Sequence, residues 1–591
     1  MHKDPHSFAR PVEAVVRNLD LALKVDFSSS TLSGRAVLQI ENIKGVPHLY
    51  LDSNRLHIER VTLNSNEEPT TFRLDPSVRY LGQALVIDIK ADTVTVNIYY
   101  KTDPEAAALQ WLTPGQTAGG KKPFLYTQSQ CILARSWVPC QDTPAVRMTY
   151  QAHIEVPPDL LAIMSAENSQ KRNSTGIYEF RMPQSIPSYL LALAVGDIEF
   201  RATGPRSGIY AEPSMVDRAA WEFAETEQMI EVIEKMYGPY LWGRYDLIVL
   251  PPSFPWGGME NPRLTFATPT VIVGDRSLVS LVAHELAHSW SGNLVTNATW
   301  NDFWLNEGFT NYLDHRVMEA LHGKEYDQML SALSLEDLQK EIQEIGSGSR
   351  DTRLKLDFTG RDPEDATTQI PYDKGQFFLR TIESYVGRTR WDEFVKAYFQ
   401  HFAFQSITTE EFLQYLRQNL VNGDGQLERD LQIEAWVYGA GVPSNIVEVK
   451  STALDKVDQQ VSEWLNGKPV GQLRTDKWST QEWMHFIRKT PAAAGDQVMS
   501  ELDSAFHFSD SQNAEVLNEW LLQAISKQYK PAYPAIERFL SSNGRRKYVK
   551  QIFTALGKTP EGLEYGRQIY AKTRGAYHTV TRDIADRILR S

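Results

Sequence analysis

The stretch His284-Glu-Leu-Ala-His288 decides how this chain of 591 residues is interpreted. In a helix, side chains four positions apart project from the same face, so His284 and His288 can direct their imidazoles toward one ion. Glu285 then stands beside that ion, where its carboxylate can take a proton from a water molecule. The spacing therefore predicts a zinc site on a helix, with Glu285 as the general base.

A catalytic zinc ion usually has three protein ligands and a fourth position for water. Glu307 occurs early in the next helical segment, and two packed helices can bring its carboxylate to the same ion. Two imidazoles and one carboxylate are a ligand set that suits zinc. Asp314 lies on the same helical face as Glu307, so it either accepts a hydrogen bond from a ligand imidazole or is a solvated helix charge.

Three motifs follow one another along the chain: Gly257-Gly-Met-Glu-Asn261, the histidine run and Trp304-Leu-Asn-Glu-Gly308. Together they resemble peptidase family M1, the gluzincin aminopeptidases. The resemblance implies a multidomain α+β fold: an N-terminal antiparallel β saddle, a thermolysin-like catalytic domain with one zinc per chain, and an all-α C-terminal domain. Four further stretches resemble the leukotriene-A(4) hydrolase branch of the family: Pro251-Pro-Ser-Phe-Pro255, Gly292-Asn-Leu-Val-Thr-Asn297, Pro371-Tyr-Asp-Lys-Gly375 and Pro139-Cys-Gln-Asp-Thr-Pro144.

The same resemblance implies roles for residues around the zinc. Glu260 would hold the α-ammonium group of a peptide, which places the first peptide carbonyl at the metal and makes the enzyme an aminopeptidase. Tyr372 would donate a hydrogen bond to the oxyanion that forms when this carbonyl is attacked. The other residues expected to bind substrate are Gln130, Gly257, Gly258, Met259 and Asn261, together with Arg545 and Lys547, which would receive the C-terminal carboxylate of short peptides.

A few positions depart from the pattern of the branch. Trp256 and Thr367 each stand where the branch has a tyrosine, Glu364 replaces an aspartate, and Cys131 replaces an alanine. In the branch, the aspartate at the position of Glu364 and the tyrosine at the position of Thr367 matter for the hydrolysis of lipid epoxides. Their replacement argues against that activity here. Glu364 and Asp365 instead suggest a substrate pocket that favours Arg or Lys as the first residue.

Three functions are compatible with these residues: an aminopeptidase acting on short peptides, an epoxide hydrolase using the same zinc, and a non-catalytic scaffold that binds peptides. Without the family resemblance, Gln130 would be interpreted as a surface amide and Tyr372 as a packing residue. Arg545 and Lys547 would be interpreted as solvated charges. The complete set of chemical groups favours the aminopeptidase.

The apolar pattern divides the chain into parts. Residues 1–199 alternate apolar and polar side chains in short segments such as Leu19–Phe27, as is typical of antiparallel β domains. Residues 200–442 form the predicted catalytic domain, a linker follows at 443–450, and residues 451–591 show the spacing of amphipathic helices. Helical spacing in the catalytic domain predicts helices over 219–236, 278–290, 307–321, 372–386 and 391–402.

Composition and charge narrow the classes of partner. The formal net charge of −13 is spread along the chain, which disfavours nucleic acid or an anionic membrane surface as the main partner. No apolar run is long enough to cross a membrane, and the N-terminus lacks the apolar core of a secretion signal. A cytoplasmic location is therefore expected, with a monomer as the default state and with Cys131 and Cys140 as inert thiols.

Overall fold

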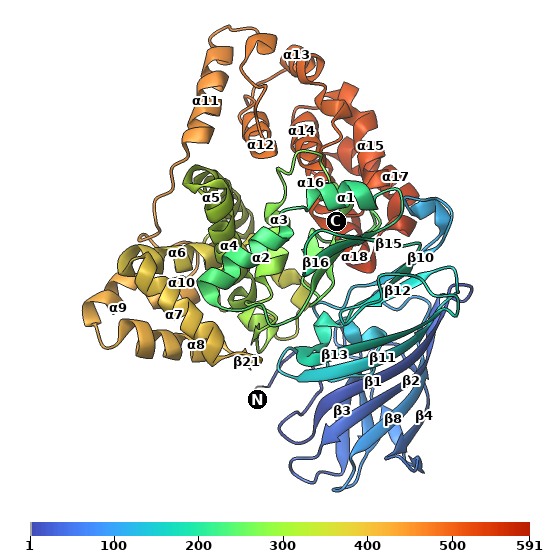
Figure 1. Ribbon diagram of the computed structural model, residues 1–591. Helices are drawn as coiled ribbons and strands as arrows, with labels where there is room; N and C mark the ends of the chain where they lie inside the picture. Colours follow the sequence, from blue (N-terminus) through green and yellow to red (C-terminus); the bar gives the residue numbers. More distant parts are fainter. Residues whose placement is uncertain (1–2, 591) are drawn as a thin grey trace.

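The computed structural model describes residues 3–590, which form a β-rich N-terminal part, a mixed central part and a helical C-terminal part (Figure 1). One continuous apolar core runs through the first two parts, and a second core fills the helical part. The expected multidomain α+β architecture is confirmed. The residue bounds given above for each domain remain a prediction.

The N-terminal part is built on a seven-stranded sheet with the order β13-β11-β1-β2-β8-β4-β5. Its strand β1 (Val15–Asp26) pairs antiparallel with β2 (Thr31–Glu41) and parallel with β11 (Arg147–Glu155). Leu19 and Leu21 are fully buried because alternate side chains of a strand face the core. The other strands of this sheet are β4 (His57–Leu63), β5 (Glu68–Pro69), β8 (Thr95–Lys101) and β13 (Ile177–Pro187).

Two smaller sheets complete this part, a four-stranded one with the order β12-β14-β10-β9 and a three-stranded one with the order β3-β7-β6. Both contribute side chains to the core that continues into the central part. Their strands are β3 (His48–Ser53), β6 (Phe72–Leu74), β7 (Gln83–Asp88), β9 (Leu109–Leu112), β10 (Phe124–Thr127), β12 (Leu161–Met164) and β14 (Leu193–Gly196).

The central part combines a five-stranded sheet, with the order β15-β16-β17-β19-β18, and helices α1 to α10. The edge strand β18 (Gly258–Met259) packs against α3 (Ser280–Ala287), and α3 in turn packs against α4 (Trp304–His322). The remaining strands are β15 (Glu199–Ala202), β16 (Ser207–Ala211), β17 (Tyr245–Val249) and β19 (Thr265–Ala267), with the pair β20 (Val295–Asn297) and β21 (Gln405–Ile407).

The helical predictions for the central part hold with three corrections. The expected helix over 278–290 is shorter, because α3 ends at Ala287 and His288 follows as its C-terminal cap residue. The expected single helix over 219–236 is divided into α1 (Val216–Glu222) and α2 (Thr226–Tyr237). The expected helix over 372–386 begins as a π-helical turn, Ile370–Lys374, and continues as α6 (Gly375–Val386). The other helices are α5 (Lys324–Ile345), α7 (Arg388–His401), α8 (Thr409–Leu416), α9 (Gly425–Leu431) and α10 (Ile433–Tyr438).

The C-terminal part consists of helices α11 to α18, coloured orange to red in Figure 1. The stretch from the end of α10 to the start of α11, where the linker is predicted, has neither helix nor strand. The helices are α11 (Thr452–Leu465), α12 (Thr480–Arg488), α13 (Asp496–Phe506), α14 (Ala514–Ser526), α15 (Tyr533–Ser542), α16 (Arg546–Leu556), α17 (Pro560–Thr573) and α18 (Thr579–Arg590).

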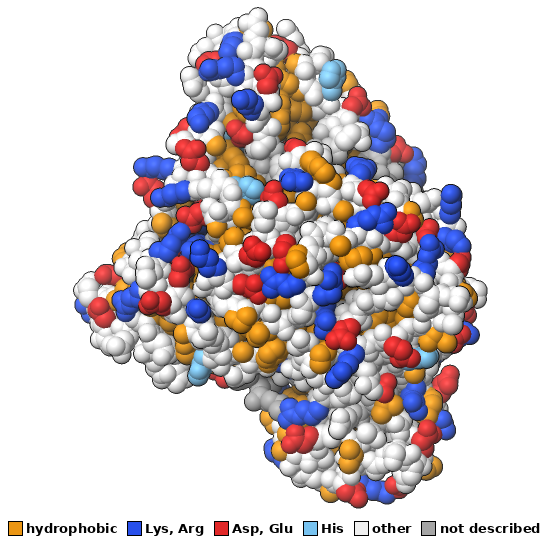
Figure 2. Space-filling model, in the orientation of Figure 1, with side chains coloured by type: hydrophobic (Ala, Val, Ile, Leu, Met, Phe, Trp, Pro, Cys, Tyr) orange, Lys and Arg blue, Asp and Glu red, His pale blue; other side chains and the backbone are white. Residues whose placement is uncertain are grey.

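Basic and acidic side chains are interspersed over the face of the molecule seen in Figure 2. Within residues 3–590, no helix has both the length and the apolar character needed to cross a membrane. Cys131 and Cys140 are both buried free thiols, as expected.

Candidate active site

Three side chains from two packed helices converge on one point. The Nε2 atoms of His284 and His288 lie 3.1 Å apart, and Oε2 of Glu307 lies 3.4 Å from the first and 3.5 Å from the second. The centre of such a triangle is about 1.9 Å from each corner, close to the length of zinc–nitrogen and zinc–oxygen bonds. Oε2 of Glu307 is buried and accepts no hydrogen bond from the protein, so a cation would satisfy it. The predicted ligand set fits zinc.

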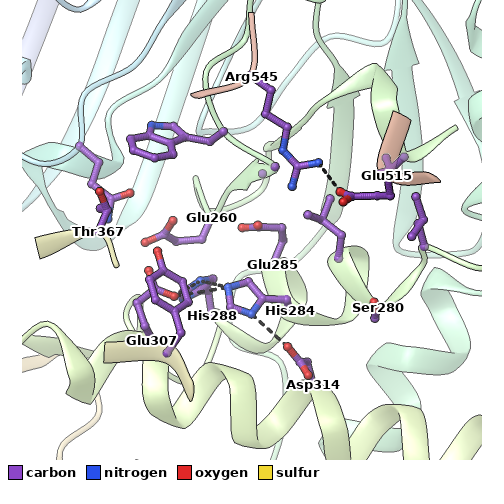
Figure 3. A pocket seen from close by; sticks show the side chains of 18 residues that line it. Glu260, Ser280, His284, Glu285, His288, Glu307, Asp314, Thr367, Glu515 and Arg545 are labelled. Carbon is purple, nitrogen blue, oxygen red and sulfur yellow. Dashed lines mark hydrogen bonds and ion pairs between the residues drawn. The ribbon is translucent and has the colours of Figure 1, made fainter. Parts of the chain in front are cut away.

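Hydrogen bonds fix the orientation of both imidazoles, and Figure 3 shows the one between His284 and Asp314. Nδ1 of His284 lies 3.0 Å from Oδ2 of Asp314, and Nδ1 of His288 lies 3.1 Å from both the carbonyl of Ser291 and the hydroxyl of Thr310. Each ring therefore has its Nε2 free for a metal. Of the two interpretations of Asp314, the hydrogen bond to a ligand imidazole is confirmed.

Glu285 follows His284 in α3, and its carboxylate faces the same cavity. It lies against the backbone of Gly258, where a Cβ atom would come within 2.2 Å of Oε1. Burial raises the pKa of Glu285 well above its usual value, and Glu260 and Glu307 add to this because they are also acidic. A divalent cation on the three ligands opposes the shift. The position suits a group that accepts and returns a proton.

Glu260 presents a second carboxylate beside the metal ligands. Its side chain is buried, and Oε1 has no hydrogen-bond partner in the protein. The amide of Asn293 donates to the backbone carbonyl of Glu260 at 2.7 Å, which fixes this residue at the end of β18. Burial raises the pKa of Glu260 to about 7. A buried carboxylate oxygen without a partner is costly, and a cationic group of a ligand would relieve that cost.

Tyr372 lies in the π-helical turn before α6. Its ring stacks on the imidazole of His284, with centroids 6.2 Å apart and an interplanar angle of 18°. Burial raises the pKa of its phenol well above 10, so the hydroxyl stays protonated and can donate. The turn reaches the metal ligands because Gly308 and Gly375 touch: a Cβ on Gly375 would lie 2.7 Å from the Cα of Gly308.

A cavity of about 340 Å³ joins these groups. It is lined by all three metal ligands, by Glu285 and Tyr372, and by four of the residues expected to bind substrate: Gln130, Gly257, Gly258 and Glu260. Arg545 lines its far end. The side chains of four other residues expected to bind substrate, Met259, Asn261, Glu364 and Lys547, do not line it.

Sequence reasoning missed several residues of the wall. Glu515, at the start of α14, faces the cavity and forms ion pairs with Arg545 and Lys547. No motif marks this glutamate, because an acid in the first turn of a helix is common for reasons of helix stability alone. The other lining residues that were not singled out are Val271, Leu278, Ser280 and Leu281.

Comparisons with known proteins identify the family. The chain is 34% identical to leukotriene A-4 hydrolase of Xenopus laevis over 597 aligned residues, covering 98% of each protein. The chain belongs to peptidase family M1. Family models match in three places: the Peptidase M1 N-terminal domain at residues 15–190, the Peptidase family M1 domain at 221–434, and the Leukotriene A4 hydrolase C-terminal domain at 478–589.

The match to the Leukotriene A4 hydrolase C-terminal domain and the similarity to leukotriene A4 hydrolases place the chain in the leukotriene A4 hydrolase-like branch of family M1. Leucine aminopeptidase 2 of Yarrowia lipolytica is 34% identical, with 99% of this chain and 93% of that protein covered. The structure of yeast leukotriene A4 hydrolase in complex with bestatin superposes with a TM-score of 0.92 at 31% identity, covering 100% of this chain and 98% of the other. The expected class, a zinc-dependent aminopeptidase, is confirmed at the level of the family.

Proposed function

We propose that this M1 peptidase removes the N-terminal residue from short peptides, with one zinc per chain. The observation that carries the proposal is the buried carboxylate of Glu260 beside the metal ligands, whose Oε1 has no hydrogen-bond partner in the protein. A carboxylate there binds the α-ammonium of a peptide and so limits cleavage to the first peptide bond. Gln130, which lines the same cavity, is positioned to assist.

His284, His288 and Glu307 would hold the zinc ion, which would supply Lewis-acid chemistry that polarises the carbonyl and makes water more acidic. Glu285 accepts a proton from the attacking water and delivers it to the leaving amine. The Tyr372 hydroxyl donates a hydrogen bond to the developing oxyanion, which it can do because its phenol is protonated. No covalent intermediate is required.

We further propose that Glu364 gives the enzyme a preference for a basic first residue. Its carboxylate lies directly behind the wall of the cavity: Oε1 accepts a hydrogen bond from the backbone N–H of Cys131, next to Gln130, and Oε2 has no partner. Asp365, the other candidate acid, forms an ion pair with Arg587 at 2.8 Å. A long cationic side chain reaching past Thr367 would therefore meet Glu364.

The lipid-epoxide alternative is the second candidate, because relatives of this chain carry the name leukotriene A4 hydrolase. Thr367 lines the cavity where the branch has a tyrosine, and Glu364 lies behind the wall, so we rank this activity below the peptidase. Analysis of the products formed from a lipid epoxide tests directly for epoxide hydrolase activity and so distinguishes it from peptidase activity. A non-catalytic scaffold would not need the full set of metal ligands and the base.

The deciding experiment measures release of the first residue from Arg-, Ala- and Leu-arylamides, with metal analysis of each protein sample. The wild type should turn over with one zinc per chain. Glu285→Gln should retain zinc but lose about 10²–10⁴-fold in kcat, the usual contribution of a general base. Glu260→Ala should lose aminopeptidase activity with zinc retained. If the zinc-loaded wild type releases no residue from any arylamide, the proposal of an aminopeptidase is wrong and the non-catalytic peptide-binding scaffold becomes the favoured function.

A further inference from the structure

The turn of residues 291–296, which lies between the end of the metal-binding helix and β20, contacts two groups of the active site. Nδ1 of His288 lies 3.1 Å from the carbonyl of Ser291. The side-chain amide of Asn293 donates to the backbone carbonyl of Glu260 at 2.7 Å. The position of the 291–296 turn therefore affects both a metal ligand and the carboxylate that is proposed to bind the α-ammonium group.

Arg147, the first residue of β11, binds the second half of this turn. Its Nη2 donates to the carbonyl of Asn293 at 2.8 Å and to the carbonyl of Ser185 at 2.6 Å, and its Nη1 donates to the hydroxyl of Thr296. Ser185 lies on β13, the strand that pairs with β11 (Figure 1). Arg147 thus joins two strands of the N-terminal sheet to a turn that belongs to the central part.

The guanidinium of Arg147 is not paired with an acid. Among residues 3–590 it forms no ion pair, and its Nε is buried without a hydrogen-bond partner. Burial lowers the pKa of Arg147 to about 10, so the side chain stays charged at neutral pH, and it lies over the ring of Phe404 at 5.8 Å from the centroid. Hydrogen bonds from a charged, planar guanidinium are strong and directional. Arg147 therefore acts on the turn through directed hydrogen bonds to carbonyl and hydroxyl oxygens.

The first half of the turn is held by α4 instead. Oγ of Ser291 donates to two backbone carbonyls of α4, at 2.8 Å and 3.0 Å. The imidazole of His288 has a second partner on the same helix, because its Nδ1 lies 3.1 Å from the hydroxyl of Thr310. The metal ligand is thus positioned without Arg147. Asn293, in contrast, is in direct contact with Arg147 through its carbonyl.

We propose that Arg147 is a positioning residue for the α-ammonium site, because it holds the carbonyl of Asn293 and so orients the amide that fixes the backbone of Glu260. This inference rests on the proposed function, in which Glu260 binds the α-ammonium group of the substrate. Loss of Arg147 lets Glu260 move relative to the metal ligands, and a displacement of about 1 Å is enough to weaken such a contact strongly. Recognition of the peptide N-terminus thus depends on a contact between the N-terminal and central parts of the chain.

The test compares two hydroxamates that bind zinc through the same group. L-leucine hydroxamate carries the α-ammonium group, and 4-methylpentanohydroxamic acid is the same molecule without it. Calorimetry on the zinc-loaded protein gives both Kd values, and the factor by which leucine hydroxamate binds more tightly is here called the ammonium preference. Damage to the metal site weakens both ligands and cancels in this ratio, and no turnover is needed. The wild type should show a preference of about tenfold to a hundredfold, as expected for a charge-assisted hydrogen bond.

Arg147→Met keeps the aliphatic stem but removes every hydrogen bond to the turn, so the ammonium preference should fall about fivefold to tenfold. Arg147→Lys keeps the charge without the planar donor group and should restore part of the preference. Asn293→Ala removes the next link and should lower the preference as much as Arg147→Met, and the double variant should lower it no further. Arg181→Met is the matched control, since Arg181 is an exposed arginine on β13, and it should leave the preference unchanged. Zinc affinity should change less than about twofold in every variant, because His288 keeps both of its partners.

The inference is wrong if Arg147→Met weakens both hydroxamates equally, because Arg147 then only stabilises the fold. It is also wrong if Asn293→Ala retains the ammonium preference of the wild type, and this result decides the question even where Arg147→Met does not fold. Both outcomes leave the aminopeptidase proposal intact. If the wild type itself binds the two hydroxamates equally well, the α-ammonium site at Glu260 is absent and the proposed function fails instead.

Discussion

The backbone of Gly258 lies in direct contact with the carboxylate of Glu285, so closely that a Cβ atom at position 258 would come within 2.2 Å of Oε1. The edge strand β18 thus forms one wall around the general base. A glycine is required there because of this close approach. Its neighbour Gly257 makes a similar approach to Arg545 and Leu281.

Gly258→Ala should therefore displace Glu285 from its position. We expect kcat for an arylamide to fall about 10²-fold, the effect of misplacing a catalytic group by about 1 Å. Zinc content should be unchanged, because the three atoms nearest to a Cβ there all belong to Glu285, which is not a metal ligand. Gly471→Ala is the matched control, since nothing lies within 4 Å of a Cβ there. Normal turnover by the Gly258 variant would show that Glu285 tolerates movement.

Tyr372→Phe removes the hydroxyl and keeps the ring that stacks on His284. We expect kcat to fall about 10²–10³-fold, as for the loss of one oxyanion donor, with little change in KM. Tyr385→Phe is the control, because Tyr385 lies on α6, the helix that follows the turn with Tyr372, and is 46% exposed. A Tyr372 variant that raises KM but keeps kcat would assign this residue to ground-state binding instead.

Asp314→Asn weakens the acceptor that orients His284. Loss of such a partner typically lowers metal affinity about 10–100-fold. Competition with a chelator, followed by metal analysis, measures this affinity directly. Activity should return when zinc is supplied in excess. If the variant holds zinc as tightly as the wild type, the hydrogen bond does not contribute to metal binding.

Local periodicity predicted much of the fold, because each strand or helix buries one face. The alternation at Leu19 and Leu21 is borne out by β1, and the four-residue spacing of His284 and His288 is borne out by α3. The parallel pairing of β1 with β11 joins segments far apart in the sequence, and nothing in either segment specifies it. The break between α1 and α2 falls at residues 223–225, where neither glycine nor proline marks it.

In the candidate site, too, local sequence patterns predicted some residues, whereas others depend on tertiary packing. Motifs predicted the metal ligands, Glu285 and Glu260, because their chemistry requires those residue types at short spacings. Glu515 escaped prediction because its place in the cavity wall depends on the packing of α14 against α16, which brings it to Arg545. The proposed selection of the first substrate residue by Glu364 depends on how far its carboxylate lies behind the cavity wall. No sequence pattern predicts that distance.

The burial of the Glu364 carboxylate predicts that the preference for a basic first residue depends on pH. Burial, reinforced by the neighbouring Asp362, raises the pKa of Glu364 to about 7. An acid with a raised pKa is neutral below that value and charged above it, so Glu364 attracts a basic side chain only at higher pH. Between pH 6 and pH 8 the ionised fraction of a group with this pKa rises about tenfold.

The ratio of kcat/KM for Arg-arylamide to that for Leu-arylamide should therefore rise by about threefold to tenfold between pH 6 and pH 8. Titration of Glu285 and Glu260 affects both substrates alike and cancels in the ratio. Glu364→Gln should give a low ratio that is independent of pH, while Asp365→Asn should keep the rise, since Asp365 is already paired with Arg587. A ratio that stays flat in the wild type, or a rise that survives in Glu364→Gln, would assign the preference to another part of the cavity.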